Sequence, residues 1–444
     1  MAITETKTKY GQVHGVQKDG YTVFRGVPYA KPPVGEKRFC PPEEPACWEG
    51  VYKADHFGCV CPQTEHEPDS FYGKEFYLDP EFGMNQSEDC LYLNIWTPAN
   101  AADEKLPVAF WIHGGAFMHG FSHESEFDGA AYCERGVILV TINYRLGAFG
   151  FLAHPWLSEE SGVGRSGNYA ILDQIAALKW VKENIAAFGG DPENITVFGQ
   201  SAGCMSVQTL VSSPLTENWI SKAIFQSAGG YDTGLNRDMP LSEAETIGQE
   251  FVELSGAKSL EELRAIPAEK IVELQEEFGR VNPPRMLSFV PNIDNHLLTC
   301  GYNEAVTEGK IKDIPYMLGS TADDIGVFPE MKEKGEHGGI YKGCINWSLA
   351  LEKLGRKPAY VYYFTRALLG DDAGAFHSSE LWYMFGTLGR SWRPKTEGDY
   401  ALSKEMMDDW TNFMKTGNPN AEGKDDWKPC TKDDPYVQVL DVRE

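Results

Sequence analysis

The chain has 444 residues, of which 42% are hydrophobic and 12% aromatic, and its formal net charge at pH 7 is −25. That apolar fraction can bury a large core, which excludes an intrinsically disordered chain. The acidic surplus argues against nucleic acid as a partner, because phosphate binding requires clustered Lys and Arg, and against an anionic membrane surface. We expect the charge to keep the surface soluble and self-repelling, with the steering of cationic substrates as the alternative.

The N-terminal residues contain no apolar signal segment, and no stretch approaches the roughly 20 apolar residues that a membrane-spanning helix needs. We therefore expect no membrane insertion and a cytoplasmic location, with an excised signal as the alternative. The ten cysteines stand singly except for Cys59 and Cys61, and no pair of CxxC motifs offers a metal site, so we expect mostly buried free thiols. Without repeats or linkers, one domain over residues 1–444 is the simplest organisation.

Short apolar runs rich in β-branched or aromatic residues predict three buried strands, at residues 108–112, 137–142 and 195–198. Between the last two, residues 171–181 have apolar side chains at helical spacing, and Gly189 and Gly190 follow as a stop signal. This order predicts a parallel, right-handed crossover of the α/β class, in which ligands gather beyond the carboxyl ends of the strands. Residues 241–280 predict helices over or beside the sheet, with a solvated charged face.

The first predicted strand runs into His113-Gly114-Gly115-Ala116, a loop of minimal side chains. Backbone N–H groups can reach a developing negative charge only where no bulky Cβ crowds them, so this composition is typical of an oxyanion hole. Each such donor typically contributes roughly 3 to 4 kcal/mol to transition-state stabilisation. A simple flexible loop is the alternative.

The third predicted strand runs directly into Gly199-Gln200-Ser201-Ala202-Gly203, a GxSxG motif, and a helix-compatible stretch follows. A strand-to-helix elbow needs small residues on both sides of the serine, because Gly199 and Gly203 must let backbone segments approach closely. The strained turn then exposes the Ser201 hydroxyl as a nucleophile. The alternative, an ordinary glycine-rich turn, does not account for the strand before and the helix after.

A serine hydroxyl is a weak nucleophile at neutral pH, so it requires a histidine base that a carboxylate holds in the right tautomer. The chain order for such an elbow is serine, acid, histidine, and only three histidines follow Ser201. His296 follows a turn, and His337 lies in a polar stretch typical of a surface loop. His377 precedes an amphipathic segment and can project from a loop where the sheet ends, so we assign the base to His377.

These residues resemble the type-B carboxylesterase family, which includes the cholinesterases and bacterial para-nitrobenzyl esterases. The resemblance runs nearly end to end and is carried also by Phe24–Gly35, Ser87–Ile95, Asn143–Gly147, Phe188–Thr196 and Thr416–Asn420. It implies an α/β-hydrolase fold, with a central, mostly parallel twisted sheet flanked by helices. It also implies a serine carboxylesterase that acts on small-molecule esters through an acyl-enzyme, with no metal and no organic cofactor.

The resemblance assigns further residues around the serine. The family's oxyanion hole is similar to Gly115 and Ala116, with Gly114 preceding them, together with Ala202. Ser227 resembles a serine that lies near the triad in the family, behind the residues that react.

Two pairings also follow from the resemblance. Glu88 and Arg145 match a structural ion pair of the family. Cys61 and Cys90 match its first disulfide, for which Cys59 is a competing partner. In a reducing cytosol these cysteines would be free thiols instead.

The acid of the triad is assigned by comparison with a family loop that ends Asp-Glu-Gly, where the glutamate is the triad member. This chain has Asp323-Asp324-Ile325, so Asp324 matches the glutamate but is one methylene shorter, and Ile325 replaces the glycine. We assign Asp324, with Asp323 as the alternative. The interval to His377 is 53 residues (377 − 324), shorter than usual in the family. We therefore expect a shortened helical cap and a wider, more open pocket.

Apolar side chains near the motifs are candidates for an acyl or alcohol pocket, with ordinary core as the alternative: Phe117, Met118, Met205, Phe328 and Trp382. The substrate stays open among simple carboxylic esters, feruloyl or cinnamoyl esters, lactones and amides. A non-catalytic binding module of the same fold is the alternative from another class. The sequence indicates no oligomeric state.

Overall fold

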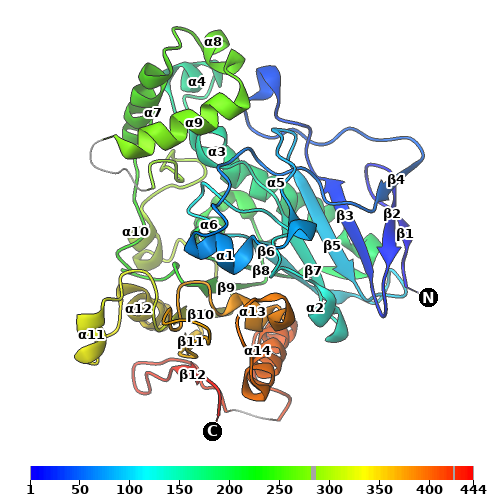
Figure 1. The fold of residues 1–444 in the computed structure, drawn as a ribbon, viewed down its shortest axis with the longest axis vertical. Coiled ribbons are helices and arrows are strands. Elements are labelled where there is room, and N and C mark those ends of the chain that lie inside the picture. The colour runs from blue at the N-terminus through cyan, green and yellow to red at the C-terminus, as the bar shows by residue number, and fades with distance from the viewer. Residues whose placement is uncertain (1, 282–286, 424–425, 444) are drawn as a thin grey trace.

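The computed structural model describes residues 2–281, 287–423 and 426–443 (Figure 1). Within these ranges one twelve-stranded sheet has the spatial order β1-β2-β3-β5-β7-β6-β8-β9-β10-β11-β12, and β4 pairs with β2. The strands are β1 Glu5–Lys7, β2 Gln12–Gln17, β3 Thr22–Pro28, β4 Val51–Ala54, β5 Tyr92–Thr97, β6 Leu106–Ile112, β7 Ile138–Ile142, β8 Gly190–Gln200, β9 Lys222–Gln226, β10 Tyr316–Thr321, β11 Tyr360–Phe364 and β12 Gln438–Leu440.

The sheet has an antiparallel part and a larger parallel part. Neighbouring strands from β1 to β7 run antiparallel along the sheet order, whereas every pair from β7 and β6 through β12 is parallel. The three predicted strands are β6, β7 and β8, next to one another in the parallel part. The predicted α/β-hydrolase architecture with a mostly parallel sheet is therefore confirmed.

Helices cover both faces of the sheet and also flank one end of it. Their bounds are α1 Phe71–Phe76, α2 Ala130–Glu134, α3 Gly147–Phe151, α4 Pro155–Glu160, α5 Tyr169–Asn184, α6 Ala202–Ser212, α7 Leu241–Ser255, α8 Leu260–Ala265, α9 Ala268–Arg280, α10 Tyr302–Thr307, α11 Pro329–Glu333, α12 Gly339–Lys353, α13 Leu381–Met384 and α14 Glu397–Thr416. The predicted helix at 171–181 is α5, and a 3₁₀ turn extends it to Gly189, whose φ of +83° suits a glycine stop.

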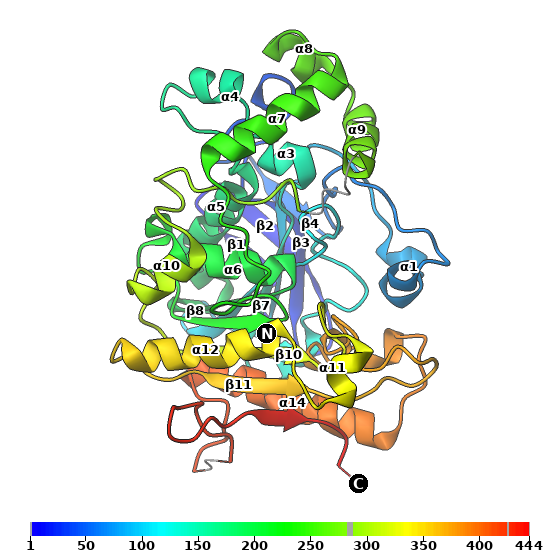
Figure 2. The same cartoon turned by 90° about the vertical axis from the view of Figure 1, so that its left-hand side faces the viewer.

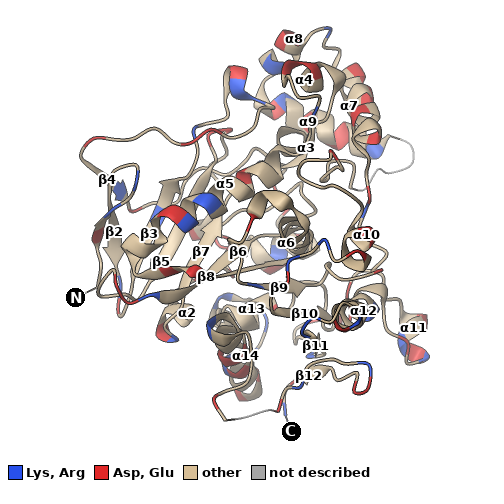
Figure 3. Ribbon diagram, turned by 180° about the vertical axis from the view of Figure 1, so that it is seen from behind, with Lys and Arg blue, Asp and Glu red and all other residues tan. Residues whose placement is uncertain are grey.

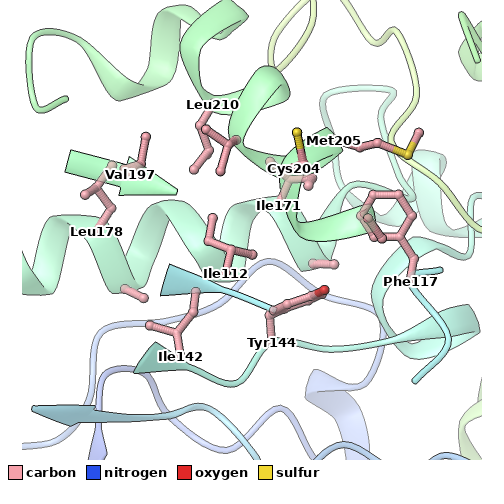
Figure 4. Close-up of a cluster of buried hydrophobic side chains, with 14 of the residues drawn as sticks. Ile112, Phe117, Ile142, Tyr144, Ile171, Leu178, Val197, Cys204, Met205 and Leu210 are labelled. Carbon is pink, nitrogen blue, oxygen red and sulfur yellow. The ribbon is translucent and has the colours of Figure 1, made fainter. Parts of the chain in front are cut away.

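Alternate side chains of the central strands explain why both faces are covered. In β6, Val108, Phe110 and Ile112 enter one buried cluster, whereas Ala109 and Trp111 enter the other. α5, α6 and α12 pack over the first face, and α2, α13 and α14 pack over the second. Figure 4 shows part of the first cluster, in which Ile112 points toward α5. The carboxyl ends of the parallel strands are thereby fixed between two packed layers.

The segment 241–280 forms α7, α8 and α9, as its helical periodicity predicts. In α9 the apolar side chains of Ile271, Leu274 and Phe278 are buried against α7 and α3. Figures 1 and 2 both show the three helices at one end of the molecule, beside the sheet rather than across it. Charged residues lie along their outer surfaces, as expected for a solvated face (Figure 3). Among the described residues, no helix has both the length and the apolar character needed to cross a bilayer.

The implied ion pair between Glu88 and Arg145 is wrong. The guanidinium of Arg145 donates two hydrogen bonds to the carboxylate of Asp173 in α5, at 2.7 and 2.8 Å, whereas Glu88 pairs with Arg38. Asp173 is completely buried, and a buried carboxylate without a counter-ion is strongly destabilising. The arginine is therefore held by the more deeply buried acid.

All ten cysteines are free thiols, and seven of them are buried. This confirms the expected buried thiols, whereas the disulfide implied for Cys61 and Cys90 is not formed. The two thiols are neighbours in the core.

Candidate active site

The carboxyl end of β8 turns into α6 at Ser201. Ser201 has φ +57° and ψ −126°, a conformation that L-residues rarely adopt, and Ala202 begins the helix. A Cβ at Gly203 would lie 2.0 Å from the carbonyl oxygen of Ile112, and a Cβ at Gly199 would lie 2.6 Å from the backbone of Gly203. The elbow therefore requires both glycines, because strand and helix backbones are in direct contact.

The loop after β6 is also strained. Gly115, Ala116 and Phe117 all have positive φ, at +98°, +55° and +61°. A Cβ at Gly115 would lie 2.2 Å from the carbonyl oxygen of His119. None of the hydrogen bonds formed between described residues uses the N–H of Gly115, Ala116 or Ala202. The loop and the first residue of α6 thus offer unengaged donors beside the serine.

His377 lies in a turn after Phe376, which forms an isolated bridge with Asp323. Its Nδ1 is 2.6 Å from Oδ1 of Asp324, and both side chains are buried. Asp323 instead pairs with Lys332, at 2.5 Å. Of the two acids left open by the sequence, Asp324 is therefore the one in contact with the histidine.

The other ring nitrogen of His377 faces Gln200, with Nε2 of the ring 3.2 Å from Nε2 of the amide. When Nδ1 donates to Asp324, Nε2 is an acceptor, so the amide donates to it. Between described residues, no hydrogen bond joins the Ser201 hydroxyl to His377. Such bonds are often long in structures without a ligand and shorten when a ligand binds.

Ser201 and His377 share a cavity of about 220 Å³. Its wall includes five of the predicted residues: Gly114, Gly115, Ala116, Ser201 and His377. Ala202 follows the serine directly, and Asp324 lies behind the histidine. The structure thus gathers around one cavity the predicted nucleophile, base, acid and backbone donors, which lie far apart in the sequence.

The cavity is smaller than most small-molecule sites, which measure about 300 to 1,000 Å³. The short interval between Asp324 and His377 predicts a wide pocket, and the structure has no such pocket at this site as a single cavity among the described residues. A second cavity of about 260 Å³ adjoins it and shares Ala116 and His119. Between Asp324 and His377, only Ile325 reaches the wall of the first cavity, as expected for a shortened cap.

The predicted pocket side chains mostly lie elsewhere. Phe117, Met205 and Trp382 are buried core residues, and Phe328 is 61% exposed. Met118 lines the second cavity. The other four side chains line neither cavity for one reason: apolar character near a motif does not reveal the direction of a side chain. Phe117, for example, points from the strained loop toward Phe151, at a centroid distance of 4.9 Å.

One wall comes from α1 and its flanks, which the sequence analysis did not single out: His66, Tyr72, Phe76 and Tyr77. Glu75 anchors this helix, because its carboxylate accepts hydrogen bonds from Trp382, Trp392 and Arg393 at 3.0, 3.0 and 2.8 Å. All three donors follow His377 in the chain. The only signal in the sequence is the density of aromatic residues around Glu75 in an otherwise polar stretch.

The loop between β6 and α2 adds two buried carboxyl groups to the wall, Glu124 and Glu126. Glu124 lies against Glu126 and Tyr77, and its Oε1 accepts the N–H of Phe121 at 2.8 Å. Burial raises the pKa of Glu124 to about 7 and holds the pKa of Glu126 well above its ordinary value. The pair therefore retains a proton near neutral pH.

Three more titratable groups surround the site. Burial lowers the pKa of His66 to about 4 and also lowers the pKa of His119, so both imidazoles are neutral at pH 7. Glu380 is completely buried, and burial, reinforced by the charge of Asp324, raises its pKa to about 7.

Ser227 lies close behind the elbow. It follows Gln226, whose carbonyl oxygen accepts the N–H of Ser201 at 2.9 Å, and its own N–H donates to Gly319 at 2.9 Å. Its hydroxyl is buried and has no hydrogen-bond partner among the described residues. The position agrees with the resemblance, whereas a role for the hydroxyl stays a prediction.

A family model described as "Carboxylesterase family" matches the chain over residues 3–343 and 340–443. The two matched stretches meet between Asp324 and His377, in the interval that is shorter than usual. The match covers almost the whole chain.

Individual relatives agree with the family match. The chain is 33% identical to para-nitrobenzyl esterase of Bacillus subtilis, over 98% of this chain and 94% of the relative. It is also 33% identical to fumonisin B1 esterase of Sphingopyxis macrogoltabida, over 95% and 83% of the two chains. A solved PNB esterase superimposes with a TM-score of 0.86 at 31% identity, covering 99% of this chain and 96% of the other. The chain belongs to the carboxylesterase family and is a carboxylic ester hydrolase.

Proposed function

We propose that the chain hydrolyses small carboxylic esters through an acyl-enzyme on Ser201, with His377 as general base and Asp324 as the acid that orients it. One observation carries the proposal. His377 contacts Asp324 at 2.6 Å with Nδ1, while its opposite edge and Ser201 border the same cavity.

In the first half-reaction, Nε2 of His377 takes the proton of Ser201 as the serine oxygen attacks the ester carbonyl. A substrate must first displace the Gln200 amide from Nε2. The imidazolium, stabilised by Asp324, then gives its proton to the departing alcohol. In the second half, the same histidine removes a proton from water, which attacks the acyl-enzyme and releases the carboxylic acid.

The tetrahedral intermediate of each half carries a negative oxygen. We assign its binding to the N–H groups of Gly115, Ala116 and Ala202, with Gly114 preceding them. These donors fit the role because their loop and helix terminus meet at the serine, and a Cβ at Gly114 would lie 3.1 Å from the Cβ of Ser201. They need no reorganisation when charge develops.

The test is hydrolysis of para-nitrophenyl esters with acyl chains of increasing length, by the wild type and by Ser201→Ala. We expect measurable turnover by the wild type, and a loss of about 10³-fold or more in the variant, whose fold is checked by circular dichroism. Turnover that persists in folded Ser201→Ala would exclude the mechanism. Absence of turnover in both proteins would point to a specialised ester outside this series.

A further inference from the structure

The cavity that holds Ser201 has a carboxylic acid pair in its wall, Glu124 and Glu126. Glu124 is 6% exposed and Glu126 is 1% exposed, yet both border the cavity. The two carboxyl groups lie against each other, and Tyr77 lies beside Glu124. The mechanism proposed above uses neither acid, so the pair needs another explanation.

The pair is not fully satisfied by the protein. Oε2 of Glu126 is buried and has no hydrogen-bond partner among the described residues. A buried carboxyl oxygen without a partner is destabilising, because its water hydrogen bonds are lost and not replaced. The wall of the cavity contains no Lys or Arg that could neutralise the pair. A donor supplied by a bound molecule would complete the hydrogen bonds.

The chemistry of the pair favours a hydroxyl group as that donor. A carboxyl group that keeps its proton presents one acceptor and one donor, and a hydroxyl is the neutral group that can both donate and accept. An ammonium group only donates, and a carboxylate would be repelled. Phe76 and Tyr77, beside the pair, offer aromatic faces for a flat ring or a sugar.

We propose that Glu124 and Glu126 form a subsite that selects esters carrying neutral hydroxyl groups, on a phenolic acid or on a polyhydroxylated alcohol. This inference rests on the proposed function, because it concerns the substrate of the same cavity. The acids and Gly114, Gly115 and Ala116 belong to one loop between β6 and α2, so the group that binds the pair also sets the position of the scissile carbonyl.

Two matched pairs of esters test the subsite, one on each side of the scissile bond. On the acyl side, the para-nitrophenyl ester of dihydroxyphenylpropanoic acid is compared with its dimethoxy analogue, which has a similar shape but cannot donate. On the alcohol side, a monoacetylated methyl glucoside is compared with the same compound after methylation of its other hydroxyls. We expect kcat/KM for the hydroxylated ester to exceed that for the methylated one by about tenfold or more in at least one pair.

The same ratio is then measured in Glu124→Gln and Glu126→Gln, with Glu134→Gln on the exposed surface of α2 as the control. We expect each subsite variant to lower the ratio at least about fivefold and the control to leave it unchanged. The ratio isolates recognition, because a merely structural defect would slow both esters alike. If one variant does not fold, the other variant and the ratio in the wild type still test the subsite.

Equal turnover of the hydroxylated and methylated esters by the wild type would overturn the proposal, as would a ratio that both variants preserve. A third ester with an ammonium group in place of the hydroxyls completes the test, and its preference over the hydroxylated ester would also overturn the assignment. Failure of the proposed function is distinguishable from failure of the subsite. In that case no ester would be hydrolysed, or hydrolysis would persist in Ser201→Ala.

Discussion

The orientation of His377 depends on a single carboxylate. Asp324 accepts from the ring at 2.6 Å with Oδ1, and its Oδ2 accepts the N–H of Thr321 at 3.0 Å. Both oxygens are therefore held, which fixes the acid although its side chain is one methylene shorter than the family's glutamate. Asp323 is adjacent in sequence but points to Lys332 and accepts the N–H of Ala375.

Asp324→Asn should leave the fold intact and lower kcat by about 10³- to 10⁴-fold, because an amide holds the imidazole in the wrong tautomer. Steady-state kinetics with a para-nitrophenyl ester measures the change. Asp323→Asn is the matched control, since asparagine keeps an oxygen for Ala375, and we expect its kcat to stay within about threefold of wild type. If the two variants lose activity equally, Asp324 does not act alone on the histidine.

Glu75 illustrates how one residue positions a whole wall. It sits in α1, in the first fifth of the chain, but its partners Trp382, Trp392 and Arg393 all follow His377. The Arg393 side chain is almost completely buried with Glu75 and also pairs with Asp371. The aromatic wall of the cavity is thus attached to the segment that follows His377, the proposed base.

At the scale of elements, the site depends on the contact between β6, β8 and α6. The Ser201 elbow and the loop that follows β6 leave the same edge of the sheet, because β6 and β8 are parallel neighbours. The contact allows no side chain at Gly203, whose Cβ would also lie 2.6 Å from the carbonyl oxygen of His113.

Gly203→Ala should push α6 away from β6 and displace the loop that begins at His113. We expect a loss of about 1 to 3 kcal/mol of unfolding free energy in urea, accompanied by reduced kcat because the proposed oxyanion donors move. Gly279→Ala in α9 is the control, since its Cβ would meet no atom within 4 Å. That variant should keep its stability or gain about 0.5 to 1 kcal/mol. Equal stability of both variants would contradict the close contact.

At the scale of the whole molecule, one sheet joins segments from both ends of the chain around a single site. The acidic residues are spread over the outer helices, consistent with a solvated surface (Figure 3). Several carboxyl groups nevertheless lie in the interior near the site, among them Glu124, Glu126 and Glu380. Their protonation links the stability of the molecule to pH. The expected cytoplasmic location stays a prediction.

The contribution of Glu380 to stability should change measurably with pH. Its pKa is about 7 in the folded chain, against an ordinary value of 4.5, so folding favours the protonated form. Its contribution to stability is therefore full below about pH 4.5 and is lost as the pH rises through 7. Glu380→Gln cannot ionise, so its stability relative to wild type should increase between pH 5 and 8, by up to about 1.4 kcal/mol per pH unit.

Thermal or urea unfolding at several pH values measures this difference. Glu134→Gln, on the surface, serves as the control and should show no such trend. A constant difference between Glu380→Gln and wild type across the range would show that the carboxyl group does not change its proton affinity on folding.

The sequence by itself determined the features that depend on local geometry. Gly199 and Gly203 around Ser201 predict a strand-to-helix elbow because only glycine permits that backbone contact. The apolar runs at β6, β7 and β8 predict buried parallel strands, and the order of serine, acid and histidine restricts the base to three candidates. These features hold because they follow from spacing and backbone sterics within a few residues.

Only the tertiary structure decided the features that depend on contacts between distant segments. In the folded chain Arg145 pairs with Asp173 rather than with Glu88, and Asp324 rather than Asp323 contacts His377. Residues of α1 form one wall of the cavity. Adjacent residues in a turn point in different directions, and a buried charge pairs with the acid that packing brings to it. Side-chain direction and burial are properties of the packed molecule, so a linear sequence does not contain them explicitly.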